Sequence, residues 1–362
     1  MLHTMTHTMT VHEWHARCTN GNAMHEYDCE FERLNEEIAR RSAKKVGIQL
    51  PAGMKRLATE IAENLSKCGV EVIISGNSCY GACDIDENLA AVVDVLFHFG
   101  HSPVRTHLNV VFVELRCTID VKPAVEEALK YLNGSRICIT TTVQHVHTLN
   151  EVAELLIRSG RHPIIGKVGK KGNEVSGVHA IYDGQVIGCD LRAAMVECDE
   201  ILFVGSGDFH PTAIAMNVCK RVVSADPFTR RVGVFTPENL IKKRILRVER
   251  AMSASSFGII VSSKSGQFNM QIARNIREKA EKRGIRSFII MIDDIREEAL
   301  CNFDLDAFVI TACPRLVDTL SVEKPVLSVR EFEIVIGERK LDELIPKPSA
   351  ATHSDNELLS KK

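Results

Sequence analysis

The chain has 362 residues, a length that predicts two or three domains instead of one. Hydrophobic residues make up 45% and charged residues 25%, a composition that can bury a core without disulfide bonds. The net charge is −2 at pH 7, so the chain lacks the excess of positive charge that binding to nucleic acid or an anionic membrane surface requires.

The two ends of the chain are expected to be tails. Residues 1–31 contain no apolar core of the kind found in a secretory signal, and residues 346–362 are polar. No apolar run reaches the roughly 18 residues of a membrane helix. The sequence therefore predicts a cytoplasmic protein that binds neither a membrane nor nucleic acid directly.

Between the tails, short apolar runs alternate with longer amphipathic stretches. Helices are predicted over Lys55–Cys68, Thr148–Ser159 and Asn269–Arg283, where apolar residues recur at i, i+3 and i+4. Strands that alternate with helices are typical of parallel sheets covered by helices, so the predicted fold class is α/β. The predicted strands are, in chain order, Val46–Leu50, Val70–Ser75, Val93–Phe97, Val110–Val113, Ile137–Thr140, a weaker Val178–Tyr182, Ile201–Val204, Val232–Val234, Phe257–Ser262, Arg286–Ile292, Ala307–Thr311 and Pro325–Val329.

One short pattern occurs three times, around Cys83, Cys189 and Cys313. Each cysteine follows a small residue, precedes Asp or Pro, and leads through a helical stretch to an apolar strand that begins 12, 12 or 13 residues later. Such self-similarity predicts three tandem homologous α/β domains, which we expect over residues 32–125, 126–235 and 236–345. If they pack about a pseudo-threefold axis, the three cysteines meet near that axis.

These three are the best metal-ligand candidates among twelve cysteines. The chain contains no CxxC pair, so a metal site has to be assembled from distant segments. A position just before a short helix is expected to lower each thiol pKa, and ligands bind at this edge of a parallel sheet. Three thiolates suit zinc, copper(I) or an iron–sulfur cluster with one open position. From the residues alone, all of these metals stay open as alternatives. So does a chance similarity among three buried cysteines that bind no metal.

The remaining cysteines have no equivalents across the repeats. Cys79 stays open as a spare metal ligand. Cys117 follows a predicted strand, is expected near a cleft and is left unassigned. Asp84 and Asp190, which follow the first two repeated cysteines, are expected to stabilise helix N-termini. Five others are expected to be small buried hydrophobic residues, namely Cys68, Cys138, Cys198, Cys219 and Cys301.

The chain resembles the diphthamide synthase subunit family over Glu32–Leu344. Three segments that contain the repeated cysteines carry the resemblance, namely Tyr80–Asp84 (YGACD), Gly184–Cys189 (GQVIGC) and Thr311–Arg315 (TACPR). Supporting segments are Gln49–Pro51, His98–Ser102 and Ser263–Gln267.

The resemblance implies that Cys83, Cys189 and Cys313 hold a 4Fe–4S cluster whose open iron binds S-adenosylmethionine. It implies cleavage of the bond between sulfur and the γ-carbon of the methionine part, giving a 3-amino-3-carboxypropyl radical and methylthioadenosine. The radical adds to the imidazole C2 of one histidine in translation elongation factor 2. The resemblance also implies a homodimer, as in the archaeal members of the family. It implies an electron donor that reduces the cluster as a further partner.

Four further residues are candidates for holding the co-substrate. Arg315, two residues after Cys313, is suited to a bidentate contact with a carboxylate. Gln267 follows a predicted strand and precedes a helix, where backbone N–H groups bind anions. His101 and His210 fall at matching points of the first two repeats and are expected to line the same cleft.

Two alternatives stay open at this point. Quinolinate synthase is similar in design, with three domains and one cysteine from each, but its small diacid-derived substrates need more anion-binding motifs than this chain shows. The other alternative is a non-catalytic α/β protein with structural zinc at the three cysteines. The YGACD and TACPR segments favour diphthamide synthase.

Overall fold

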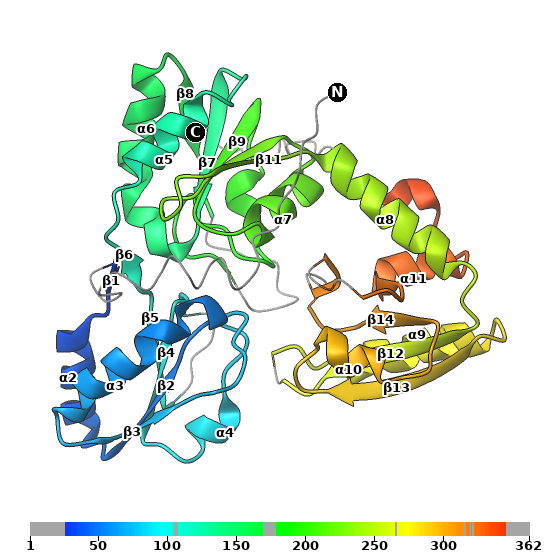
Figure 1. Ribbon diagram of the computed structural model, residues 1–362, viewed down its shortest axis with the longest axis horizontal. Coiled ribbons are helices and arrows are strands. Elements are labelled where there is room, and N and C mark those ends of the chain that lie inside the picture. Colours follow the sequence, from blue (N-terminus) through cyan, green and yellow to red (C-terminus); the bar gives the residue numbers. More distant parts are fainter. Residues whose placement is uncertain are drawn as a thin grey trace, which may run out of the picture.

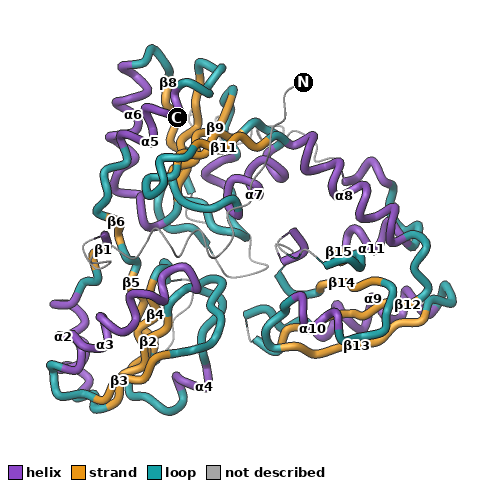
Figure 2. Tube along the Cα trace, viewed as in Figure 1, coloured by secondary structure: helices purple, strands orange, loops and turns teal. Residues whose placement is uncertain are grey.

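The computed structural model describes residues 26–103, 108–168, 179–264, 266–313, 316–318, 320 and 322–344. These residues form three α/β units, each built on one sheet, which follow one another along the chain (Figure 1). Apart from one short two-stranded ribbon, the strands gather in three separate groups with helices beside them, as the tube in Figure 2 shows. Within the described ranges, no helix has both the length and the apolar character that crossing a membrane requires.

The first unit has a fully parallel sheet in the order β3-β2-β4-β5. Every residue of β4 is buried, as expected for a central strand covered on both faces. Leu34 and Ile61, from two different helices, belong to the same fully buried core as Ile48 of the sheet. The strands are β2 (Lys45–Gln49), β3 (Glu71–Ile74), β4 (Val95–Phe99) and β5 (Val110–Val113), and the helices are α2 (Phe31–Arg41), η2 (Ala52–Leu57), α3 (Ala58–Ser66) and α4 (Glu87–Ala90).

A small antiparallel ribbon joins the start of the described chain to the segment after β5. Tyr27 in β1 (Tyr27–Asp28) pairs with Cys117 in β6 (Arg116–Cys117). The pairing lies within the segment expected to be a tail; residues 1–25 and 345–362 are outside the described residues.

The second unit has five strands in the order β11-β10-β9-β7-β8, with only β11 antiparallel to its neighbour. The strands are β7 (Arg136–Thr141), β8 (His162–Ile165), β9 (Glu200–Val204), β10 (Val222–Ala225) and β11 (Val232–Phe235). Its helices are α5 (Lys122–Leu129), η3 (Val143–Thr148), α6 (Leu149–Arg158), η4 (Arg192–Ala194) and α7 (Phe209–Val218).

The third unit has a parallel sheet in the order β13-β12-β14-β15, and the long helix α8 connects it to the second unit (Figure 1). Its strands are β12 (Ser256–Ser262), β13 (Arg286–Ile292), β14 (Ala307–Ile310) and β15 (Val326–Ser328). Its helices are α8 (Pro237–Ala251), α9 (Met270–Glu281), α10 (Glu297–Cys301), η5 (Leu316–Asp318), α11 (Val329–Val335) and η6 (Leu341–Leu344).

The three parallel sheets share one strand order. In each, the first strand along the chain is central, the second lies at one edge, and the third and fourth follow on the other side. This shared topology confirms the α/β fold class and supports the repeat. The domain limits and the pseudo-threefold axis stay predictions.

The topology corrects the sequence alignment of the third copy. Cys83 and Cys189 lie in the connection between the second and third strands of their units, whereas Cys313 lies after the third strand, β14. The strand that follows Cys313, β15, is thus the counterpart of β5 and β10, and its alignment with β4 and β9 was wrong. The true counterpart of the Cys313 loop in the first unit is the loop after β4, which contains His101.

The other predicted elements are mostly confirmed. The weak strand candidate Val178–Tyr182 is wrong for residues 179–182, where no strand occurs, and Val178 is outside the described residues. The apolar pattern did not predict two strands, β8 and β10. β8 contains a proline, and β10 is a short apolar segment that follows a largely buried helix. The pattern also missed α8, because this helix is dominated by charged side chains and buries only Pro237, Val248 and Ala251.

Candidate metal centre

Three thiols, one from each unit, lie within electrostatic reach of one another. Burial raises the pKa of Cys83, and the nearby Cys313 raises this pKa further. Burial also raises the pKa of Cys189 to about 12, with further contributions from Cys83 and Cys313. The structure thus brings together the three cysteines that the repeat selected, in loops beyond the carboxyl ends of parallel strands.

The expectation that helix dipoles lower these thiol pKa values was wrong. Cys83 precedes the four-residue α4, and Cys189 precedes the single turn η4, so the helix that follows each cysteine is too short for a strong dipole. Burial and mutual repulsion dominate and raise both pKa values. Three adjacent thiolates therefore need a compensating cation, which is a property of a metal site.

The three thiols remain accessible at the surface. Cys83 and Cys313 are half-buried, and Cys189 is exposed as a residue, although protein surrounds most of its sulfur. Cys79, by contrast, is only 4% exposed. A ligand can thus approach the three-cysteine site from solvent.

The third unit packs directly on the backbone of Cys83. A Cβ atom placed on Gly266 would lie 2.0 Å from the Cys83 carbonyl oxygen, so only glycine fits. The neighbouring Gln267 side chain hydrogen-bonds to the Cys83 thiol, an interaction that lowers its pKa. Gln267 N–H also donates to the Lys264 carbonyl at 2.9 Å, which closes the turn that presents these residues.

A nearly buried ion pair connects the same two units. Lys264 Nζ lies 2.8 Å from Asp84 Oδ2 and also donates to the Ser78 carbonyl at 3.1 Å. The two side chains are 10% and 4% exposed, so breaking the pair leaves an unpaired charge in a poorly solvated place. Burial raises the pKa of Asp84, and hydrogen bonds from Lys264 and the Tyr80 N–H partly offset this rise.

Asp190 stabilises a helix N-terminus as expected, because it accepts from the Arg192 N–H, the first of η4, at 3.1 Å, whereas Asp84 does not cap α4. Asp86 caps α4 instead, accepting from the Leu89 N–H at 3.0 Å. Asp190 accepts from the Ala180 N–H and forms an ion pair with Arg192. Both aspartates thus hold the cysteine loops in place.

A second set of contacts holds the same loop from the third unit. Asp294 accepts from Ser78 Oγ at 2.6 Å and from Tyr80 Oη at 2.8 Å. Arg296 pairs with Asp294 and donates to Ser78 Oγ. The loop that contains Cys83 is therefore fixed against the third unit on both sides of Cys79.

The four predicted co-substrate residues have different positions. Gln267 lies at Cys83, whereas Arg315 is outside the described residues. His210 is the second residue of α7 in the second unit and stacks on Phe203, with ring centroids 5.8 Å apart.

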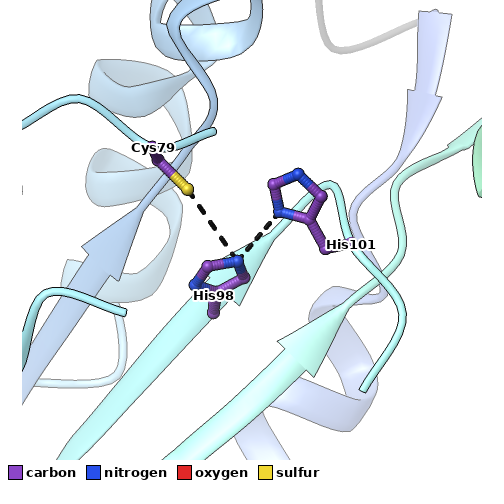
Figure 3. A group of neighbouring side chains, drawn as sticks. All are labelled: Cys79, His98 and His101. Atoms are coloured by element: carbon purple, nitrogen blue, oxygen red, sulfur yellow. Dashed lines mark hydrogen bonds between the residues drawn. The ribbon is translucent and has the colours of Figure 1, made fainter. Parts of the chain in front are cut away.

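His101 belongs to a group of side chains that the sequence did not predict. Its Nδ1 lies 2.9 Å from His98 Nε2, and Cys79 Sγ lies 3.9 Å from that same Nε2 (Figure 3). The only sequence signal for this group is that His98 and His101 fall in one of the segments that carry the family resemblance.

The expectation that the other cysteines are buried is confirmed for some of them and wrong for others. Cys138 and Cys198 are buried as expected, but Cys219 is half-buried, and Cys68 and Cys301 are exposed. Both exposed residues lie at or just beyond the C-terminus of a helix, where the chain turns toward solvent. Cys117 is buried in β6, and its expected place near a cleft is not supported by its 1% exposure.

The fold and the site define an α/β protein that gathers thiols from three sheets. The family model described as "Putative diphthamide synthesis protein" matches residues 50–345. The chain belongs to this family.

Curated relatives and a solved structure agree with this assignment. The 2-(3-amino-3-carboxypropyl)histidine synthase of Pyrococcus horikoshii is 36% identical over 324 residues, covering 86% of this chain and 92% of the relative. The protein with the same name from Methanocaldococcus jannaschii is 26% identical over 340 residues, covering 86% and 90%. The crystal structure of Dph2 from Pyrococcus horikoshii with a 4Fe-4S cluster is similar with a TM-score of 0.76 and 34% identity, covering 89% of this chain and 96% of that one.

The side chains present fit an iron–sulfur cluster. Cys83, Cys189 and Cys313 offer three soft sulfur atoms, and a cationic iron centre would relieve the repulsion between their thiolates. The glycine at position 266 allows the third unit to approach the Cys83 backbone without a side chain between them.

We predict that Lys264→Met lowers iron and sulfide content several-fold after anaerobic reconstitution. The change leaves the buried Asp84 carboxylate without its cation. It lowers the free energy of unfolding by about 3–5 kcal/mol, as for other buried ion pairs that lose one partner. Iron and sulfide assays and thermal unfolding measure the effect. Lys282→Met, at an exposed lysine, is the matched control; equal cluster content in both variants would contradict the prediction.

We also predict that Gly266→Ala reduces cluster content while the far-ultraviolet circular dichroism stays native. The added methyl group must displace the Cys83 backbone, which moves one ligand relative to the other two. Gly53→Ala is the control, because a Cβ there meets no atom within 4 Å. A Gly266→Ala protein that loads as much iron as Gly53→Ala would show that this contact does not position Cys83.

Proposed function

We propose that this protein catalyses the first step of diphthamide biosynthesis. It transfers the 3-amino-3-carboxypropyl group of S-adenosylmethionine to the imidazole C2 of a histidine in translation elongation factor 2. The observation that carries the proposal is the convergence of three thiols from three units in a chain 36% identical to a 2-(3-amino-3-carboxypropyl)histidine synthase. No comparable observation favours quinolinate synthase chemistry.

In this proposal Cys83, Cys189 and Cys313 hold a 4Fe–4S cluster. When bound and reduced, the cluster supplies the electron for cleavage between the sulfur and the γ-carbon of S-adenosylmethionine, and its open iron provides a place for this co-substrate. Overall, the bond from sulfur to the γ-carbon is replaced by a bond from that carbon to imidazole C2, and methylthioadenosine and a proton are released.

The protein side chains bind and orient. Gln267 hydrogen-bonds to Cys83 and is thereby placed beside the reacting centre. Arg315 is assigned to the co-substrate carboxylate, because its planar guanidinium suits a bidentate contact. His210 is assigned to the wall of the co-substrate site, whereas His101 is not, because its Nδ1 lies 2.9 Å from His98 Nε2.

The proposal includes three partners and a location. Elongation factor 2 is the protein substrate, an electron donor reduces the cluster, and a second copy of the chain completes a homodimer. The protein acts in the cytoplasm. The relatives' names support the enzyme class, and the partners follow from the family resemblance.

The product nucleoside provides the direct test of the reaction. We expect anaerobic protein, dithionite, S-adenosylmethionine and elongation factor 2 to yield methylthioadenosine and a modified factor whose mass increases by one aminocarboxypropyl group. Liquid chromatography with mass spectrometry measures both products. Appearance of 5′-deoxyadenosine instead would overturn the proposed cleavage, and omission of the reductant is the control.

The ligand assignment has a separate test. We expect Cys83→Ala, Cys189→Ala and Cys313→Ala each to lose most iron, sulfide and activity, because each removes one of three ligands. Cys301→Ala, at another exposed cysteine, is the matched control and should retain all three. A variant among the first three that keeps full iron and sulfide would remove its cysteine from the ligand set.

A further inference from the structure

Three possible metal ligands meet at the sheet edge of the first unit (Figure 3). Cys79 comes from the connection after β3, His98 from β4 and His101 from the loop after β4. Their ligand atoms, Sγ, Nε2 and Nδ1, all lie within 4.8 Å of one another. Cys79 and His98 are buried and His101 is half-buried, so the group is enclosed by protein.

We propose that Cys79, His98 and His101 form a second metal site, which binds zinc and is separate from the three-cysteine site. The proposal goes beyond the proposed function and does not depend on it.

The distances are close to those of zinc coordination. Zinc–sulfur bonds of about 2.3 Å and zinc–nitrogen bonds of about 2.0–2.1 Å place tetrahedral ligand atoms roughly 3.3–3.6 Å apart. The distance from Cys79 Sγ to His98 Nε2 is 3.9 Å, and that from His98 Nε2 to His101 Nδ1 is 2.9 Å. The third distance, from Cys79 Sγ to His101 Nδ1, is at most 4.8 Å, so side-chain shifts on the order of 1 Å bring the three atoms to coordination distance.

Gln49 fixes which nitrogen of His98 is available. The Gln49 amide nitrogen donates to the Asp84 carbonyl at 2.8 Å, and its oxygen accepts from the Asp86 N–H at 3.1 Å. That oxygen also lies 3.0 Å from His98 Nδ1, so Nδ1 carries the proton and donates. The lone pair of a neutral His98 is then on Nε2, the atom that faces Cys79 and His101. An oriented imidazole of this kind is the usual partner of a metal ion.

The charge state of the group also suits a cation. Burial lowers the pKa of His98 well below its ordinary value and that of His101 to about 4, so both rings are neutral at pH 7. Burial raises the pKa of Cys79 to about 12, so its thiol is neutral as well. The nearby charges of Asp84 and Lys264 pair with each other. No side chain of the group carries a positive charge that would repel the metal, and zinc binding has to displace the Cys79 proton, a cost that the bond from metal to thiolate must exceed.

The donor set selects the class of metal. One thiolate and two imidazoles are typical ligands of zinc, whereas magnesium and calcium prefer oxygen. Three protein ligands leave one position open for water or another small ligand. The alternative is a hydrogen-bonded group without metal, in which His101 Nδ1–H donates to His98 Nε2.

Metal analysis of the complete protein is the first test. Wild-type protein loaded with its cluster under anaerobic conditions is expected to contain about one zinc per chain in addition to iron, measured by inductively coupled plasma mass spectrometry. The full chain with Cys83→Ser, Cys189→Ser and Cys313→Ser should keep that zinc while it loses iron. Loss of zinc together with the iron would place the zinc at the three-cysteine site and overturn the proposal.

Cobalt(II) identifies the ligands in this cluster-free protein. We expect one equivalent to bind with a thiolate-to-cobalt charge-transfer band and the intense visible bands of tetrahedral coordination. Adding Cys79→Ser should abolish the charge-transfer band, and adding His98→Gln should weaken metal binding at least tenfold. Cys29→Ser and His145→Gln are matched controls, because these residues are equally buried, at 3% and 2% exposure. Unchanged binding in the Cys79 variant would refute the site.

X-ray absorption of the zinc-loaded, cluster-free protein decides the matter even where a variant fails to fold. A first shell of one sulfur and two imidazole nitrogens supports the site, and a shell rich in sulfur or lacking imidazole overturns it. A negative result would leave methylthioadenosine formation unaffected, so failure of this site and failure of the proposed function are distinguishable.

Discussion

The three-cysteine site depends on a backbone contact that leaves no room for a side chain. Gly266 of the third unit touches the Cys83 carbonyl, and the Lys264–Asp84 pair holds the two loops together beside that contact. Because protein interiors are closely packed and deform little, this contact fixes the distance between Cys83 and the third unit. The parallel sheets below supply rigid strand ends from which these loops project.

The sequence predicted the fold class and the choice of cysteines for sound physical reasons. Apolar runs with strand lengths mark buried parallel strands, and internal repetition distinguished Cys83 from Cys79. The third copy was misaligned because a cysteine, a short helical turn and a strand occur in two successive connections of the same unit. Strand order, which depends on pairing between distant segments, was needed to show that Cys313 lies one strand later.

Contacts between distant segments account for what the sequence did not predict. Lys264 and Asp84 are separated by 180 positions, and nothing in either local pattern indicates that they pair. Burial also reversed the expected direction of the thiol pKa shifts, because desolvation of a charge outweighs the dipole of a one-turn helix. Cys79, His98 and His101 approach one another only because parallel strands bring successive loops to one edge of the sheet.

The origin of the three thiols in successive units also constrains when the site can form. Domains tend to fold in the order of their synthesis, so the first unit can fold while the third is still being made. Until β14 has joined its sheet, Cys313 has no defined position and Cys83 lacks the surface that fixes its loop. A newly made chain therefore passes through a stage in which the third unit does not yet cover the Cys83 loop. If the chain binds the proposed cluster, iron and sulfide have to be delivered after that stage, which would make cofactor loading a late event in the maturation of the protein.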